Sequence, residues 1–323
     1  PQTLPCPYCE VPQPIDPAES ARGIDCTSCG TGASLGAWLL PSTSPHYLAI
    51  SETTTDAFTQ NIHSHSVAYT IAPNGEGVAS GTVVQIGDRL LIATTEHTIP
   101  DDLKLLGFVA KDRIVYGDRS RWVRRAGKDR FNDIGFIELE TAAIVDLGLN
   151  PISVERIVDA GPGDPRLKSR VIGFPWEMRQ DHFVAKGVRT FKPLSYGCET
   201  VHLAAWPSLS FATKDKDPSI HVLAFYERED NIDWQVDYVQ SSATPDPRGM
   251  SGGGYWQRPR FLADSEVWLP DQLCLFAIQS AWFEKKSFLK GTQIIHWLKL
   301  VADSYPDELH SELHRRFPRL DTL

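Results

Sequence analysis

Short apolar runs separated by turn residues follow one another along most of the chain. The first three lie at residues 67–71, 81–86 and 89–94, and Gly87-Asp88 joins the last two as a hairpin. Further runs lie at residues 105–110, 113–116, 134–139, 171–175, 221–226, 234–239 and 273–280. Strands that recur roughly every 8–12 residues with turn signals are typical of an all-β barrel or sandwich. The chain is therefore predicted to be all-β.

Near the end of the chain, the spacing of the apolar residues becomes that of a helix. Residues 292–303 place Ile294, Ile295, Leu298 and Val301 on one broad face, which predicts a helix. A second helix is predicted to open at Pro306. These patterns divide the chain into a first β-barrel, a second β-barrel and C-terminal helices, which follow an N-terminal unit and a linker rich in Ser, Thr and Pro. The predicted boundaries are 1–40 for the N-terminal unit, 41–61 for the linker, 62–150 and 151–290 for the barrels, and 291–323 for the helices.

Four of the six cysteines form two Cys-x-x-Cys pairs near the start: Cys6, Cys9, Cys26 and Cys29. Two such pairs offer four thiolates to one tetrahedral Zn²⁺, and a segment this short needs a metal to fold because it cannot bury a core. The sequence therefore predicts a structural zinc in a segment that resembles a zinc ribbon. Two disulfides, or a redox pair, are the alternatives.

Charge and composition narrow the class of protein. Acidic residues (41) outnumber basic ones (32), and the net charge of −9 argues against general nucleic-acid binding. No apolar run reaches the length of a bilayer span and no signal peptide is recognisable, so a cytoplasmic location without membrane contact is expected.

One stretch runs against this acidic balance. Residues 111–130 hold eight basic side chains around Trp122: Lys111, Arg113, Arg119, Arg121, Arg124, Arg125, Lys128 and Arg130. Such a run is usually a solvated surface; the alternative is a docking site for an acidic partner or nucleic acid.

The most distinctive stretch is residues 245–256, in which Ser251 lies among four glycines and follows two prolines. Glycines let the backbone adopt positive φ and approach a ligand closely, so that peptide N–H groups can converge beside the hydroxyl. A nucleophile with such donors is what acyl transfer requires. A glycine-rich turn between two strands is the alternative.

Three segments together resemble the chymotrypsin-like serine proteases, in that family's chain order. The histidine follows a strand in Ile92-Ala-Thr-Thr-Glu-His97, the aspartate opens one in Asp133-Ile-Gly-Phe-Ile137, and the serine lies in Gly249-Met-Ser-Gly-Gly253. The resemblance covers about residues 65–303 and implies two six-stranded antiparallel β-barrels with the site between them.

The resemblance also implies the role of each residue. His97 would be the general base for Ser251, Asp133 would hold the histidine tautomer, and the N–H groups of Gly249 and Ser251 would form the oxyanion hole. The rival histidines His63 and His65 precede the first strand, and the rival aspartates Asp118 and Asp129 open no apolar strand.

The expected substrate pocket departs from the family. Pro245 falls at the pocket floor with Asp246 beside it, and Ser280 and Trp282 line the cleft. Small P1 side chains are therefore expected; a loop shift of one residue would place Asp246 on the floor and favour Arg or Lys.

Met250 replaces the acidic residue that zymogen-type members pair with a new N-terminus. Activation by a regulatory protein partner that orders the 249–251 loop is therefore expected, not propeptide cleavage. The sequence predicts a serine endopeptidase that cleaves protein or peptide substrates. The alternative is a catalytically silent protease-fold scaffold that acts through the zinc-ribbon-like segment and the basic residues of 111–130.

Overall fold

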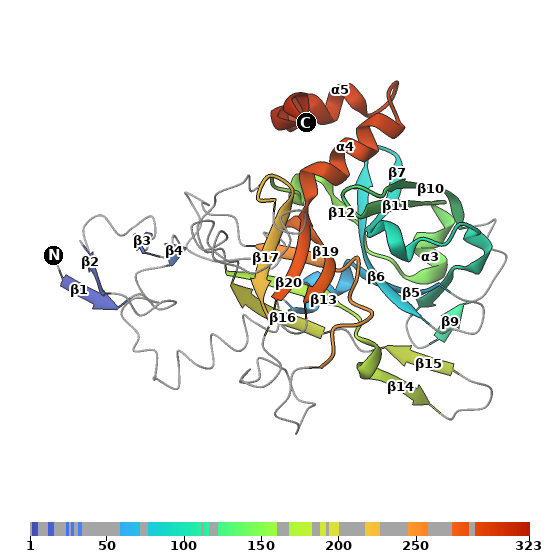
Figure 1. Ribbon diagram of the computed structural model, residues 1–323, viewed down its shortest axis with the longest axis horizontal. Helices are drawn as coiled ribbons and strands as arrows, with labels where there is room; N and C mark the ends of the chain where they lie inside the picture. The colour runs from blue at the N-terminus through green and yellow to red at the C-terminus, as the bar shows by residue number, and fades with distance from the viewer. Residues whose placement is uncertain are drawn as a thin grey trace.

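The computed structural model describes the chain in sixteen stretches, separated by gaps. They are residues 2–5, 12–15, 24–25, 27–28, 32–33, 59–71, 77–110, 113–115, 122–159, 168–182, 188–191, 194–199, 217–226, 245–257, 273–283 and 288–323. Two large sheets dominate this part, and one follows the other along the chain (Figure 1).

The first sheet contains eight of the described strands, in the order β10-β11-β7-β6-β5-β8-β9, with β12 parallel to β6. Its strands are β5 (Ser66–Thr70), β6 (Val78–Ile86), β7 (Arg89–Thr94), β8 (Gly107–Ala110), β9 (Arg113–Val115), β10 (Val123–Asp129), β11 (Ile134–Leu139) and β12 (Ile152–Ser153). Apart from β12, neighbouring strands are antiparallel.

The second sheet contains six described strands in the order β16-β13-β18-β19-β20-β17, all antiparallel. They are β13 (Lys168–Gly173), β16 (Leu194–Glu199), β17 (His221–Phe225), β18 (Gly254–Gln257), β19 (Cys274–Phe283) and β20 (Phe288–Gln293). Three two-stranded pairs complete the strands: β1 (Gln2–Pro5) with β2 (Pro12–Ile15), β3 (Ile24–Asp25) with β4 (Gly32–Ala33), and β14 (Arg179–His182) with β15 (Val188–Phe191).

Helices are few in the described residues and gather at the C-terminus. The α-helices are α3 (Ala142–Leu147), α4 (Ile294–Ser304) and α5 (His310–Arg316), and residues 59–64, before β5, are also helical. Short 3₁₀ turns are η2 (Glu96–Thr98), η3 (Leu103–Leu105), η5 (Val154–Arg156), η6 (Trp176–Met178) and η11 (Pro318–Thr322). In Figure 1, α4 rises directly from the end of β20, and α5 lies above it, next to the C-terminus.

The predicted all-β class with C-terminal helices is confirmed, and two successive, mainly antiparallel sheets stand where two six-stranded antiparallel barrels were predicted. Two details differ: the first sheet has eight described strands, not six, and the basic segment that includes residues 123–129 is a strand, β10. Strand β16 is not among the predicted strands, and it belongs to the second sheet because it pairs with β13.

One apolar core joins both sheets to α4. It brings Phe136 of the first sheet against Trp256 and Ile278 of the second, and against Trp297 and Leu298 of the helix. All five side chains are at most 1% exposed. Because burial of apolar surface drives folding, this shared core fixes the two sheets and the helix relative to one another.

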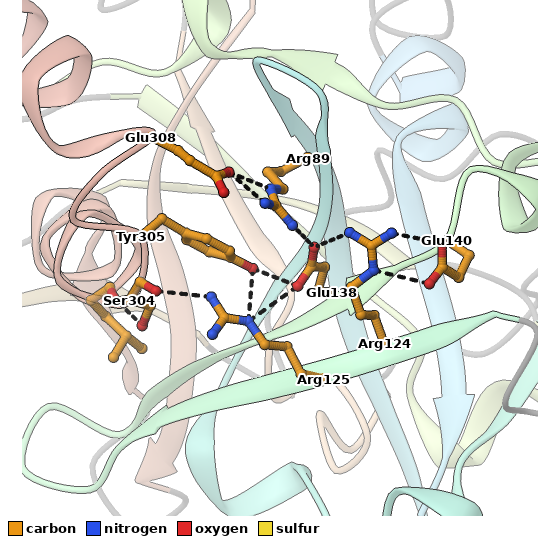
Figure 2. Close-up of polar contacts among 9 residues, drawn as sticks. Arg89, Arg124, Arg125, Glu138, Glu140, Ser304, Tyr305 and Glu308 are labelled. Atoms are coloured by element: carbon orange, nitrogen blue, oxygen red, sulfur yellow. Dashed lines mark hydrogen bonds and ion pairs between the residues drawn. The ribbon is translucent and has the colours of Figure 1, made fainter.

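A buried carboxylate fastens the end of α4 to the first sheet (Figure 2). The Glu138 side chain is 1% exposed and contacts the guanidinium groups of Arg89 at 2.7 Å, Arg124 at 3.2 Å and Arg125 at 3.1 Å. Tyr305 donates its hydroxyl to the same carboxylate at 2.7 Å. Burial raises the pKa of Glu138, but the hydrogen bonds from Arg89 and Tyr305 outweigh it and hold this pKa below its usual value.

The described basic side chains of residues 111–130 form ion pairs within the chain. Four such side chains are described: Arg124 and Arg125 pair with Glu138, Lys128 with Asp101 at 2.8 Å, and Arg130 with Glu96 at 3.2 Å. These four charges pair within the chain and lie in a strand and its turn. Of the other four, Lys111, Arg119 and Arg121 lie outside the described residues, as does the side chain of Arg113.

Candidate active site

His97 and Asp133 meet at the end of the first sheet. His97 lies in η2, three residues after β7, and Asp133 immediately precedes β11, which pairs with β7. The imidazole Nδ1 is 2.8 Å from Asp133 Oδ1 and 3.0 Å from Oδ2, and the His97 backbone N–H donates to Oδ1 at 3.3 Å. An acceptor at Nδ1 favours the tautomer with its proton there, which leaves Nε2 able to accept a proton.

Asp133 is held in an unusual backbone conformation. Its φ is 50°, which makes it the one non-glycine residue with positive φ in the described part of the chain. Such a conformation persists where surrounding contacts over-determine it. Two of them flank the residue: Thr292 Oγ1 donates to the carbonyl of Asn132 at 2.8 Å, and Trp297 Nε1 donates to that of Gly135 at 3.0 Å. The second sheet and α4 therefore hold this aspartate.

The environment of His97 favours the protonated ring. The hydrogen bond to Asp133 is the main cause, and the charges of Asp133 and Glu96 add to it, so the pKa of His97 lies above its usual value despite burial and the nearby Lys290. The imidazole is nonetheless about half exposed, so solvent can reach its free edge.

The rival histidines and aspartates are placed elsewhere. His65 is buried: its Nδ1 contacts the carbonyl of Asn150 at 2.7 Å, and its Nε2 contacts Arg156 at 2.8 Å. Asp129 accepts the backbone N–H groups of the turn before Asp133 and therefore shapes that turn. His63 stacks obliquely against Phe174, and Asp118 lies outside the described residues.

The turn that carries Ser251 packs against the first sheet. The backbone N–H of Ser80, in β6, donates to the carbonyl of Ser251 at 2.9 Å. A Cβ on Gly252, whose φ is 91°, would lie 2.0 Å from the Ser80 carbonyl oxygen and 2.1 Å from Thr94 Oγ1. Only glycine fits this approach, since real side chains are never that close. Thr94 ends β7, which leads to His97, so the serine turn lies against the strand that carries the histidine.

Hydrogen bonds to two carbonyl groups orient the peptides 248–249 and 250–251 of this turn. The Arg248 carbonyl accepts the N–H of Trp176 at 2.7 Å, and the Met250 carbonyl accepts that of Gly253 at 2.8 Å. In a trans peptide the C=O and N–H point in opposite directions, so the N–H groups of Gly249 and Ser251 are directed away from these bonds. Neither N–H has an acceptor among the described residues. Both are therefore available to a developing oxyanion.

The predicted catalytic serine is not hydrogen-bonded to the predicted base. Ser251 Oγ and His97 Nε2 make no hydrogen bond to each other, both being within the described residues. The structure thus joins His97 to Asp133 and places Ser251 on a turn that packs against the same sheet, without a hydrogen bond between Ser251 Oγ and His97 Nε2. Catalytic hydrogen bonds of this kind often tighten only when substrate binds.

The predicted pocket residues have structural contacts. Asp246 is buried, its Oδ1 accepts the backbone N–H of Arg248, and its Oδ2 pairs with the Arg248 guanidinium at 2.9 Å. The carbonyl of Pro245 accepts the hydroxyl of Tyr226 at 2.5 Å. Trp282 packs edge-on against Tyr226, with ring centroids 6.5 Å apart. An Asp246 already paired with Arg248 is poorly suited to bind a basic P1 side chain.

Ser280, the remaining predicted cleft residue, is buried in β19, and its Oγ donates to the Lys290 carbonyl at 3.2 Å. The hydroxyl therefore stabilises the pairing of β19 with β20.

The predicted zinc ligands Cys6, Cys9, Cys26 and Cys29 all lie outside the described residues. Within the stretches that are described, no group of three or more potential ligands is placed to hold a metal ion. The zinc site therefore stays a prediction. Burial raises the pKa of the Cys274 thiol.

No protein-family model matches the chain, and no curated protein matches it. Among solved structures, the chain is similar to the scabies mite inactivated protease paralogue S-I1, with 12% identity and a TM-score of 0.43 over 76% of this chain and 96% of that one. It is similar to a thermostable serine protease, AL20, from an extremophilic microorganism, with 13% identity and a TM-score of 0.39 over 74% of this chain and 92% of that one.

A third structure comes from work on the coupled folding and binding of the Sesbania mosaic virus VPg protein, with 11% identity, a TM-score of 0.40, and coverage of 72% of this chain and 87% of that one. At such identities a likeness concerns fold alone. Within the described residues, every helix is too short or too polar to cross a membrane.

Three residues that support the site were not singled out from the sequence: Ser80, Thr292 and Trp297. Each acts through a partner far away in the chain, such as the 162 residues between Trp297 and Gly135. A single sequence carries no local signal for such pairs.

Proposed function

We propose that this protein is a serine endopeptidase that uses Ser251 as nucleophile, His97 as general base and Asp133 as the group that orients the base. The observation that carries the proposal is the bidentate contact of His97 Nδ1 with the Asp133 carboxylate, at 2.8 and 3.0 Å. It supports the tautomer that leaves Nε2 able to accept a proton, and it stabilises the imidazolium that forms when the base accepts one.

The reaction follows from these roles. The Ser251 hydroxyl attacks the substrate carbonyl, and His97 Nε2 takes its proton. The carbonyl oxygen becomes an oxyanion, which the N–H groups of Gly249 and Ser251 stabilise. His97 then gives the proton to the leaving amine. In the second half, His97 takes a proton from water as the water attacks the acyl group, and returns a proton to Ser251 as the acid product leaves.

The substrate proposed is a protein or peptide with a small P1 side chain. Two observations favour this choice over a basic one: Asp246 is neutralised by Arg248, and Trp282 packs against Tyr226 beside the expected pocket. A regulatory protein partner and a cytoplasmic location remain predictions from the sequence.

A catalytically silent fold is the second candidate, and the open contact between Ser251 Oγ and His97 favours it. A fluorophosphonate probe separates the two. We expect covalent labelling at Ser251 that is lost in Ser251→Ala and falls steeply in His97→Ala. If correctly folded protein stays unlabelled over the whole pH range from 6 to 9, the silent candidate holds.

A further inference from the structure

Ser80 belongs to the first sheet, yet three of its hydrogen bonds reach the other half of the chain. Its backbone N–H donates to the Ser251 carbonyl at 2.9 Å. Its hydroxyl donates to the Gly249 carbonyl at 2.7 Å and accepts the N–H of Phe174 at 2.9 Å. The residue is fully buried. The Ser80 end of these bonds is therefore shielded from solvent, while Gly249 and Ser251 are partly exposed.

These bonds fall on the part of the turn that must be oriented for catalysis. The Gly249 carbonyl belongs to the peptide between the two candidate oxyanion donors, the N–H groups of Gly249 and Ser251. Fixing this carbonyl fixes the plane of its peptide, and with it the rotations on either side. A hydroxyl has one hydrogen and two lone pairs, so Ser80 Oγ can donate to the turn and at the same time accept the N–H of Phe174, the residue that follows β13.

Met250, the residue before the nucleophile, is uncharged and forms no ion pair that could order the turn. Met250 is fully buried in an apolar cluster with Tyr226 and Tyr255. Its backbone N–H completes a tight turn to the Pro247 carbonyl at 2.9 Å. An ammonium group in such surroundings would be desolvated without a partner, which is costly.

Ser80 is itself fixed to the segment that carries His97. Thr94 Oγ1 donates to the Ser80 carbonyl at 2.8 Å and lies 2.7 Å from the hydroxyl of Tyr69. That hydroxyl also contacts Thr98, the neighbour of His97, at 2.6 Å. One buried set of hydroxyl groups therefore connects the serine turn to the 3₁₀ turn of the histidine.

We propose that Ser80 is a positioning residue for the oxyanion hole: its hydroxyl holds the Gly249–Ser251 turn with both N–H donors open, as an uncharged brace built into the chain. The inference rests on the proposed function. According to this inference, Ser80 orders the 249–251 turn, and no protein partner is needed to order it.

The test compares Ser80→Ala with Thr70→Val in the otherwise complete chain. Thr70 is a matched control because it is also fully buried in the first sheet, and its hydroxyl donates to Gly107, away from the serine turn. Two quantities are measured on each variant at a temperature where circular dichroism shows it folded. One is the second-order rate of fluorophosphonate labelling at Ser251 as a function of pH; the other is hydrogen exchange of the peptide that covers residues 245–257.

In Ser80→Ala we expect labelling about 100-fold slower, because a small misplacement of a catalytic group costs that much. The pH midpoint should stay at the wild-type value, because the His97–Asp133 contact is untouched, and exchange in residues 245–257 should accelerate. Thr70→Val should change neither. Ser80→Thr, which keeps the hydroxyl, should recover part of the rate.

Equal labelling and equal exchange in Ser80→Ala and wild type overturn the inference, as does a loss that Thr70→Val reproduces. If the wild type itself is not labelled, the proposed function fails; accelerated exchange confined to Ser80→Ala would still establish the brace.

Discussion

Tyr305 donates its hydroxyl to the buried carboxylate of Glu138 at 2.7 Å, which joins the end of α4 to β11. Burial and the neighbouring carboxylate together raise the pKa of Tyr305 to about 12. The phenol therefore keeps its proton and can donate at neutral pH. This contact lies at the centre of the cluster in Figure 2 and leads to the first prediction.

Glu138→Gln should destabilise the protein by about 3 kcal/mol, because breaking a buried charge cluster leaves its partners uncompensated. Urea unfolding at pH 7 measures the change. Arg124→Gln is the control: its side chain is about half exposed, so a much smaller loss of stability is expected. Equal losses in the two variants would contradict the central role of the carboxylate.

The second prediction concerns the pH dependence of the site. General-base catalysis requires neutral His97, and its pKa is raised above 6.5, mainly by the bond to Asp133. Ser251 labelling should therefore increase with pH through a midpoint above 6.5. Asp133→Asn should move this midpoint down and lower the rate by about 10⁴-fold, because the tautomer is then wrong.

Glu96→Gln is the companion variant for that experiment. Its charge also raises the pKa of His97 without a hydrogen bond to the ring, so a smaller downward shift of the midpoint is expected with little loss of rate. An unchanged midpoint in Asp133→Asn would show that the pair does not control the titration.

Acid should destabilise the fold through His65. Burial and, to a lesser extent, Arg156 lower the pKa of His65 below 6.5, so the unfolded chain binds a proton first as the pH falls. Stability is then complete above the unfolded pKa and is lost progressively below it. Between pH 7 and pH 5 the wild type should lose on the order of 1 kcal/mol more than His65→Gln in urea unfolding. Parallel pH profiles for the two proteins would refute this assignment.

The fourth prediction is about one Zn²⁺ per chain, held by Cys6, Cys9, Cys26 and Cys29. Elemental analysis of freshly purified protein should show it, and Cys9→Ser should lower the metal content. Cys274→Ser is the control, because Cys274 lies in β19, far along the chain from the two Cys-x-x-Cys pairs, and should not affect the zinc. Disulfides among the four N-terminal cysteines would rule the site out.

Residues with a local signature could be proposed from the sequence, and residues defined by distant partners could not. His97, Asp133 and Ser251 each lie in a short motif beside a strand, which a single sequence displays. Ser80 contributes to the same region through a carbonyl 169 residues away, and nothing near it in the chain marks this role. The arginines of β10 were open to interpretation as a docking site for the same reason.

Strands with mixed composition were harder to predict than the apolar ones. β20 contains Lys290 and Gly291 and gives no clean alternation, yet it is central in the second sheet because β17 and β19 pair with it on either side. Its position depends on these neighbours, which the local pattern does not reveal.

The two carbonyls that flank Asp133 are bonded to Thr292 and Trp297, 160 and 162 residues later in the chain. During synthesis, the ribosome makes Asp133 long before either partner emerges. The strained aspartate then has nothing to hold it, and contacts of such wide sequence separation form late in folding. A nascent chain would therefore lack a fixed His97–Asp133 pair until β20 and α4 have been made. Under the proposed function, such a delay would protect the unfinished polypeptide from cleaving itself.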